Sequence, residues 1–307
     1  MKKNTPVIHP APGGPVTARI QTDAGLLLMV VIWAVNFSII KVVLDDLTPL
    51  ALNALRFPVA SVVVWAALRW RGPLPLPERR DVPRILLLGL VGNVVYQMFF
   101  IFGADRTRAG NASLLLAITP ILVAVGSAAI GHERLQPRVW LGVLATIAGI
   151  ALVVAGGSQV GLGQETLAGD LILIVASVAW SIYTIGSRPM VERYGSIPVT
   201  AWTLWSGTIV LFLAGIPDLL SLRWSEVPGT TWLGVVYAGG LAIGLAYIIW
   251  NQGIRVIGST RTATYSNLVP VLALVVAWFM LGEVPSLWQA VGAAVIIGGV
   301  SLARGDS

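Results

Sequence analysis

Two similar pairs of side chains lie in the middle of long apolar segments, where they could contact a small solute. Trp33 and Asn36 are three residues apart and share one face of a helix, and Trp180 and Tyr183 repeat this arrangement about half the chain later. Tryptophan usually lies at the membrane interface, but both indoles lie well inside their segments. Each could stack on an aromatic ring or face an ammonium group through a cation–π interaction. Ordinary helix packing is the alternative.

Polar side chains also interrupt the apolar segments 85–104 and 231–254. Tyr96 and Gln97 lie in the first segment, and Tyr247 lies in the second at the position that matches Gln97. A buried amide or phenol loses hydrogen bonds unless it faces a partner or water. We therefore expect these side chains to point into the protein and to line a cavity.

Proline interrupts the apolar segments 109–130 and 262–281. Pro120 lies in the first and Pro270 in the second. Proline removes a backbone donor and frees a carbonyl about one turn earlier, which bends a helix. In a membrane such a break is tolerated only inside protein or beside water. We predict a hinge at each proline, with a static kink as the alternative. The polar side chains before the second proline are then expected beside the substrate path, namely Tyr265, Ser266 and Asn267.

Two cations lie inside apolar segments and are possible contacts for an anion. Lys41 is close to the end of its segment and could extend to the lipid headgroups. Arg56 is roughly 10 Å deep by the helical rise. A buried arginine is costly and is a functional candidate. It could bind a carboxylate of a substrate, pair with Asp45 or Asp46, or cap backbone carbonyls.

The elements that position these residues follow from the composition. Of 307 residues, 56% are hydrophobic and 11% are charged, whereas a soluble domain carries roughly 25% charged residues. The sequence therefore predicts an all-α polytopic membrane protein, because continuous apolar runs favour helices over the alternating strands of a barrel. Ten segments reach or approach the roughly 20 residues that cross a bilayer: 24–44, 49–69, 85–104, 109–130, 138–156, 169–187, 197–216, 231–254, 262–281 and 286–303.

The basic residues predict the orientation of the chain. With the N-terminus inside, fifteen Lys and Arg residues fall in the inner connections and termini and three in the outer connections. This excess predicts that both termini are cytoplasmic. The basic residues form no patch or tail, so the net charge of +6 indicates membrane orientation rather than binding of nucleic acid.

The sequence offers no set of residues for catalysis. It has no cysteine, its two histidines are peripheral, and its carboxylates lie in connections, termini or segment edges, with Asp170 the nearest to an exception. A nucleophile with a base, a metal set or a carboxylate pair is therefore missing from the apolar segments. We predict no catalytic residue, no metal site and no cofactor.

The two halves of the chain resemble each other. VIWAVNFSIIKVVL (31–44) aligns with VAWSIYTIGSRPMV (178–191), and TPILVAVGSAAIGHE (119–133) aligns with VPVLALVVAWFMLGE (269–283). The offset is five segments, an odd number, so we expect the halves to have opposite orientations. Inverted repeats build transporters with a site near the midplane between the halves. The predicted units are an unstructured cytoplasmic N-terminus (1–23), a first repeat (24–156), a linker (157–168), a second repeat (169–303) and a cytoplasmic tail (304–307).

These motifs resemble the EamA family of the drug/metabolite transporter (DMT) superfamily over residues 24–303. The matching pieces are WAVNF (33–37) with Lys41, the Arg56-Phe57 pair, the two prolines and the Gly/Glu ends at 131–133 and 282–283. The resemblance implies an alternating-access exporter of small metabolites, commonly amino acids, in the bacterial inner membrane. Within the family, the aromatic content is most similar to the YddG-type aromatic amino-acid exporters. Because the Arg-Phe pair is common to members with different substrates, the resemblance favours a structural role for Arg56.

We therefore expect a small-molecule substrate, an amino acid or related metabolite, between the halves. A transporter of nucleotide sugars, other organic anions or drugs is the alternative, but anionic cargo would require several inward cations and only Lys41 and Arg56 are available. An intramembrane enzyme is disfavoured, and a channel is disfavoured because no charged ring or filter-like repeat is present. The lack of an acid near the midplane predicts facilitative transport, or coupling without such an acid. No feature of the sequence bears on the oligomeric state.

Overall fold

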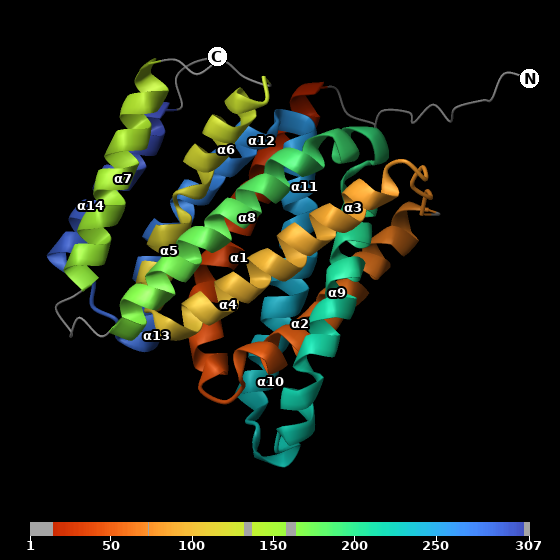
Figure 1. Cartoon of the computed structure of the whole chain (residues 1–307), viewed down its shortest axis with the longest axis horizontal. Coiled ribbons are helices and arrows are strands. Elements are labelled where there is room, and N and C mark those ends of the chain that lie inside the picture. Colours follow the sequence, from red (N-terminus) through yellow and green to blue (C-terminus); the bar gives the residue numbers. More distant parts are fainter. Residues whose placement is uncertain (1–14, 73, 132–136, 158–163, 304–307) are drawn as a thin grey trace, which may run out of the picture.

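A computed structural model describes residues 15–72, 74–131, 137–157 and 164–303. Every element in these ranges is helical, and the long helices lie side by side in a bundle (Figure 1). The tail 304–307, Glu133, most of the predicted N-terminus and half of the predicted linker lie outside the described residues. The elements of the first half are α1 (Pro15–Leu44), α2 (Pro49–Arg71), α3 (Val82–Gly89), η1 (Leu90–Val95), α4 (Tyr96–Arg106), α5 (Ala109–Leu116), α6 (Thr119–Ala129) and α7 (Pro137–Gly157).

The second half has the same order of α- and π-helical elements, with two short 3-10 turns added, η3 and η5. Its elements are α8 (Gln164–Tyr194), α9 (Ser196–Ser221), η3 (Trp224–Glu226), α10 (Gly229–Val236), η4 (Tyr237–Leu245), α11 (Ala246–Ile257), α12 (Ser259–Tyr265), η5 (Ser266–Leu268), α13 (Val269–Leu281) and α14 (Leu287–Ala303). α1 and α8 begin inside the predicted unstructured N-terminus and the predicted linker. The difference arises because hydropathy detects only the apolar part of a helix, whereas backbone hydrogen bonding continues into the polar flank.

Eight helical segments of the described chain are long and apolar enough to cross a membrane. Two further apolar stretches, Trp140–Gly149 in α7 and Leu287–Gly299 in α14, are shorter. The chain is thus an all-α multi-pass membrane protein, as predicted from the composition, and the count of ten crossings stays a prediction.

α7 and α14 pack against each other at one side of the bundle (Figure 1). A Cβ atom on Gly299 would lie 2.8 Å from the carbonyl oxygen of Gly142, which is too close for any other residue. Glycine at this position therefore lets the two backbones approach, as small residues commonly do between membrane helices.

Both segments that contain a midpoint proline are broken rather than bent. The α-helical pattern stops between α5 and α6, and again between α12 and α13, where η5 forms a short 3-10 turn. Pro120 and Pro270 are each the second residue of the helix that follows the break. The first N–H groups of a helix have no intrahelical partner, so a proline there sacrifices no hydrogen bond. The prolines thus begin new helices next to the interruption.

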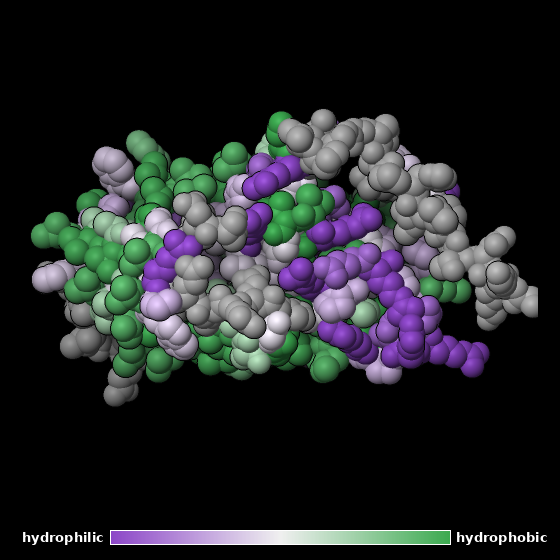
Figure 2. Space-filling view, turned by 90° about the horizontal axis from the view of Figure 1, so that it is seen from above, coloured by the Kyte–Doolittle hydropathy of each residue, from purple (hydrophilic) through white to green (hydrophobic). Residues whose placement is uncertain are grey.

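Hydrophilic residues gather at one end of the bundle. This end carries the α2–α3, α8–α9 and α11–α12 connections (Figure 1), and Figure 2 shows it from above, with hydrophilic residues on the side of α2, α3 and α9. Arg193 at the end of α8 pairs with Asp81 and Glu78 of the α2–α3 connection, and the Tyr194 hydroxyl donates to Asp81 Oδ2 over 2.6 Å. These contacts join the end of α8 to the α2–α3 connection at this end of the molecule.

Candidate functional site

A cavity of about 60 Å³ lies among the central parts of the helices and beside both helix breaks. α1, α2, α4, α5 and α6 of the first half contribute to its wall, as do α8, η4, α11, η5 and α13 of the second half. The wall residues are Trp33, Asn36, Phe37, Arg56, Tyr96, Gln97, Phe100, Ser113, Leu116, Ala117, Thr119, Trp180, Ala242, Ile243, Tyr247, Ser266 and Val269.

Most of the residues predicted to bind substrate lie in this wall. Seven of the ten are present: Trp33, Asn36, Tyr96, Gln97, Trp180, Tyr247 and Ser266. The other three, Tyr183, Tyr265 and Asn267, are not wall residues. Of the two predicted anion contacts, Arg56 lies in the wall and Lys41 does not.

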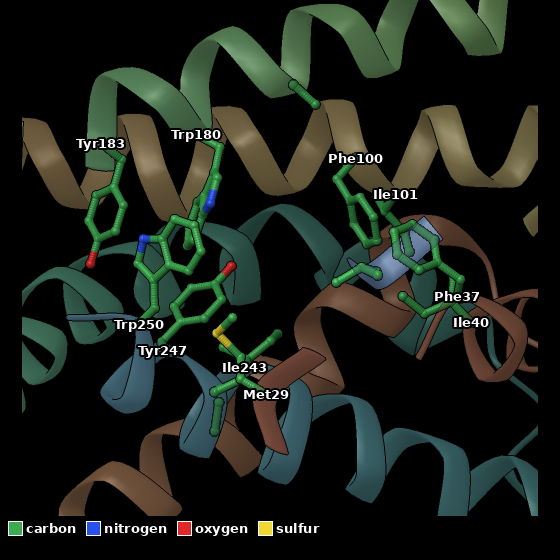
Figure 3. Packing of buried hydrophobic residues seen from close by; sticks show 14 of the residues in the cluster. Met29, Phe37, Ile40, Phe100, Ile101, Trp180, Tyr183, Ile243, Tyr247 and Trp250 are labelled. Atoms are coloured by element: carbon green, nitrogen blue, oxygen red, sulfur yellow. The ribbon is translucent and has the colours of Figure 1, made fainter. Parts of the chain in front are cut away.

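Aromatic rings from both halves meet at Trp180, which is 4% exposed. Figure 3 shows it beside Tyr183, Tyr247 and Trp250. Its ring centroid lies 4.9 Å from that of Tyr247, 5.1 Å from that of Tyr183 and 5.6 Å from that of Trp250. It also lies 4.7 Å from Tyr96 of the first half. Such contacts stabilise a cluster beyond the burial of its apolar area.

Trp33 belongs to the same cluster. Its ring meets Trp180 edge to face, with centroids 6.1 Å apart, so the two matched tryptophans of the halves are in contact. Its Nε1–H donates to the carbonyl oxygen of Ala242 in η4 over 2.9 Å. η4 is a π-helical segment, and such segments leave backbone groups poorly aligned with the helix and often occur at functional sites. The indole is therefore fixed across the two halves.

Arg56 is 1% exposed and is held by amide oxygens. Its Nε and Nη2 donate to Asn53 Oδ1 over 3.0 and 2.7 Å, and Nη2 also donates to Gln97 Oε1 over 2.7 Å. Gln97 Nε2 in turn donates to the Tyr247 hydroxyl over 2.5 Å. A chain of hydrogen bonds thus connects α2, α4 and α11. Its polar groups lie beside the aromatic cluster.

Arg56 does not use the carboxylates that the sequence offered. Within the described ranges no Asp or Glu lies within ion-pair distance of its guanidinium. Asp46 instead accepts a hydrogen bond from Thr231, and Asp45 is exposed. The guanidinium carbon lies 5.7 Å from the centroid of the Phe100 ring, at a distance that permits a cation–π interaction.

Lys41 and two of the predicted residues outside the wall have other partners. Lys41 Nζ donates to the carbonyl oxygens of Ala104 and Asp105 over 3.0 and 3.1 Å, which ties α1 to the end of α4. The Tyr183 hydroxyl accepts a hydrogen bond from Asn251 Nδ2 over 2.9 Å. The Tyr265 hydroxyl donates to Asp23 Oδ1 over 2.7 Å.

Asn267 is also absent from the wall, and it is 4% exposed. Its amide nitrogen and oxygen have no hydrogen-bond partner in the described structure.

Several wall residues were missed by the sequence prediction. Phe37 and Phe100 face each other with ring centroids 5.9 Å apart (Figure 3). Phe37 is four residues from Trp33 and Phe100 is three from Gln97, so helical spacing from the predicted residues would have found both. Ser113 of α5 and Thr119, the first residue of α6 after the helix break, also lie in the wall.

Among the described residues, no group of His, Cys, Asp and Glu could hold a metal ion. The side chains of the wall can make two kinds of contact. Aromatic rings can contact an apolar or aromatic group, and the Arg56 cluster with Asn36 can contact polar or charged groups.

Comparison with known proteins gives the family. A model of the EamA-like transporter family matches residues 22–155 and again residues 167–305. A solved crystal structure of 25% sequence identity superposes with a TM-score of 0.70, covering 93% of this chain and 96% of that chain.

Relatives cover nearly the whole chain. The "Uncharacterized transporter YdfC" of Bacillus subtilis is 30% identical over 89% of this chain and 87% of its own. The "Probable terminal-alkyne amino-acid exporter" of Streptantibioticus cattleyicolor is 32% identical over 90% of this chain and 91% of its own. The "Probable amino-acid metabolite efflux pump" of Salmonella typhimurium is 29% identical over 89% of this chain and 91% of its own. The expectation from the sequence motifs is confirmed, and the chain belongs to the EamA-like transporter family.

Proposed function

We propose that this transporter exports amino acids with neutral or aromatic side chains by alternating access. The observation that carries the proposal is the composition of the cavity wall, where aromatic rings of both halves adjoin a hydrogen-bonded cluster that contains one guanidinium. The rings suit a side chain, and the polar cluster suits a zwitterion. Two relatives whose names refer to amino-acid export or efflux support the same class of cargo.

The size of the cavity supports a moving site. Its volume of about 60 Å³ is smaller than the roughly 150 Å³ of an apolar cavity that accepts benzene. An aromatic side chain can therefore enter only when rings of the cluster separate. We infer that the structure corresponds to a closed state and that the two halves, as inverted five-helix repeats, separate on alternate sides of the membrane.

The charge of the wall weighs against the alternative cargo. Arg56 is the one cationic side chain among the wall residues. A nucleotide sugar carries two phosphates, which need several cationic or helix-terminal donors. A single guanidinium suits one carboxylate. We therefore rank amino acids above nucleotide sugars, other organic anions and drugs, and we propose no catalytic role.

The position of the acidic residues supports transport without a carboxylate near the midplane. Asp170, in α8, is buried but accepts a hydrogen bond from Thr107 Oγ1 over 2.7 Å, close to where α4 ends. No Asp or Glu is among the wall residues. We propose facilitative transport across the bacterial inner membrane, with both termini in the cytoplasm, as the basic residues predict.

The test is exchange of labelled solutes by the purified protein in liposomes. We expect labelled phenylalanine, tryptophan or leucine to exchange with the same unlabelled amino acid, and glucose and a nucleotide sugar to fail as competitors. Trp33→Ala should abolish exchange, whereas Trp140→Ala, which changes an exposed tryptophan of α7, should not. Exchange of a nucleotide sugar in place of amino acids would refute the proposal. Uphill accumulation driven by a pH gradient alone would refute the facilitative part.

A further inference from the structure

We propose that Arg56 binds the carboxylate of the transported solute, and that this carboxylate replaces the Gln97 side chain on the guanidinium. The inference rests on the proposed function, since it assigns one residue of the same cavity to one group of the cargo. It chooses carboxylate binding, which the sequence left open, over the structural role that the family resemblance favoured for Arg56.

The guanidinium has donors to spare. Nε–H and one N–H of Nη2 form one edge of the group, and Asn53 Oδ1 accepts from both. The second N–H of Nη2 donates to Gln97 Oε1. The hydrogen bonds of Arg56 to described residues use Nε and Nη2 and leave Nη1 unused. Arg56 is also a wall residue of the cavity. Guanidinium has five N–H donors in a planar fork, so its two Nη1 donors are available to a solute.

The charge of Arg56 also requires a partner. Its side chain is 1% exposed, and the groups that hold it are neutral amides and the face of Phe100. A buried cation without an anion is unfavourable because it has lost its hydration. An entering carboxylate would neutralise it and would form charge-assisted hydrogen bonds that are stronger than those of an amide.

The geometry identifies Gln97 as the group that the carboxylate displaces. A carboxylate binds guanidinium best through two parallel hydrogen bonds. Asn53 already occupies the edge formed by Nε and Nη2. The other edge is formed by Nη1 and the second N–H of Nη2, and this N–H donates to Gln97. Two-point binding on that edge therefore requires Gln97 Oε1 to leave. Because the other end of Gln97 donates to Tyr247, its departure would loosen a contact between the two halves.

The test uses three probes that differ in one group each: L-phenylalanine, L-phenylalaninamide and 3-phenylpropanoate. Binding to the purified protein is measured by thermal unfolding and by isothermal titration. Phenylalanine and 3-phenylpropanoate should raise the unfolding temperature, and the amide should bind at least about tenfold more weakly than the amino acid because it lacks the charged acceptor. Equal affinity for amide and amino acid would overturn the inference, even if no variant folds.

Variants then assign the effect to Arg56. Arg56→Gln should remove the preference for the carboxylate, and Arg56→Lys should retain part of it. Arg69→Gln is the matched control, because Arg69 lies on the same helix over the ring of Trp65 and is not a wall residue, and it should keep the full preference. A preference that survives in Arg56→Gln would overturn the inference.

Gln97→Leu tests whether the carboxylate replaces Gln97 on Arg56 or whether Gln97 positions Arg56 for the solute. If the carboxylate replaces Gln97, the variant should bind phenylalanine at least as tightly as the unmodified protein. Weaker binding would show that Gln97 holds Arg56 in place for the solute and would overturn the displacement. A different result would refute the proposed function alone. If liposomes exchange no amino acid but 3-phenylpropanoate binds through Arg56, the inference about Arg56 is supported and amino-acid export is refuted.

Discussion

Gln97 of α4 and Tyr247 of α11, which occupy matched positions in the two sequence halves, are joined by a hydrogen bond of 2.5 Å. Trp33 and Trp180 are likewise matched and in contact. These four residues line the cavity, and they come from both of the segments that match the family model. The cavity therefore lies between the two halves, where a relative movement of the halves would change contacts in its wall.

The hydroxyl of Tyr247 is expected to stabilise the folded protein. Tyr247→Phe keeps the ring beside Trp180 but leaves the buried Nε2 of Gln97 without its acceptor. Leaving a buried donor unsatisfied costs about 1–3 kcal/mol, so we expect a lower unfolding temperature with no loss of expression. A double-mutant cycle with Gln97→Leu measures the pair directly. Additive effects of the two changes would contradict a coupling through this bond.

That the chain consists of long apolar helices could be predicted from the sequence, because crossing a bilayer imposes a long apolar run on each helix, whereas the count of ten crossings stays a prediction. The correspondence of Trp33 and Trp180 was also visible in the repeat, although their contact was found only in the structure. The hydrogen-bond partners of the buried side chains could not be predicted from the sequence. Arg56 is held by Asn53, which is one helical turn away, and not by the nearby acids. Hydropathy does not report the direction of a side chain, so it could not choose between them.

The π-helical segments η1 and η4 lie at similar places in the two halves and have no clear signature in composition. They shift the register of the residues that follow, so positions that seem equivalent on an ideal helix face different ways. Tyr183 was selected because it repeats the place of Asn36 beside a tryptophan, and Tyr265 and Asn267 were selected as polar residues before Pro270. Tyr183 stacks on Trp180 and bonds to Asn251 instead of lining the cavity.

The indole nitrogen of Trp33 is expected to matter separately from its ring. Trp33→Phe keeps an aromatic ring but removes the bond to the Ala242 carbonyl. The net loss of one hydrogen bond is about 0.5–1.5 kcal/mol, so folding should persist while the rate of amino-acid exchange falls. Trp33→Ala should abolish exchange because it also opens the aromatic cluster. Exchange kinetics in liposomes, compared with Trp140→Phe as a control on α7, distinguish the two effects. Identical rates for Trp33→Phe and the unmodified protein would show that the ring alone acts.

Asn36 is expected to contact the ammonium group of the solute. It is 7% exposed, it is a wall residue, and its Oδ1 has no hydrogen-bond partner in the described structure. A buried acceptor without a partner is unfavourable, and an ammonium donor would satisfy it. Asn36→Leu should therefore raise the KM for phenylalanine roughly tenfold, the effect of one charge-assisted hydrogen bond. Affinity for 3-phenylpropanoate, which has no ammonium group, should change little. A similar loss for both ligands would assign Asn36 to packing.

Two adjacent glycines of η4 give the sharpest test of how the cavity is built. A Cβ atom on Gly239 would lie 2.3 Å from the backbone oxygen of Arg56, whereas one on Gly240 would make ordinary contacts of 3.7 and 3.8 Å with Val63 and Val59. Gly239→Ala must push η4 away from α2 at the residue that carries the guanidinium, and overpacking of this kind costs about 1–3 kcal/mol.

The neighbouring substitution is the control. Gly240→Ala removes a flexible residue from a helical segment without a clash, so its stability should be unchanged or higher by up to about 1 kcal/mol. We expect Gly239→Ala to lower the unfolding temperature and to weaken phenylalanine binding together, because the displaced α2 backbone carries Arg56 with it. Equal unfolding temperatures for the two variants would mean that α2 and η4 do not approach as closely as the structure has them, and the position of Arg56 in the cavity wall would then be wrong.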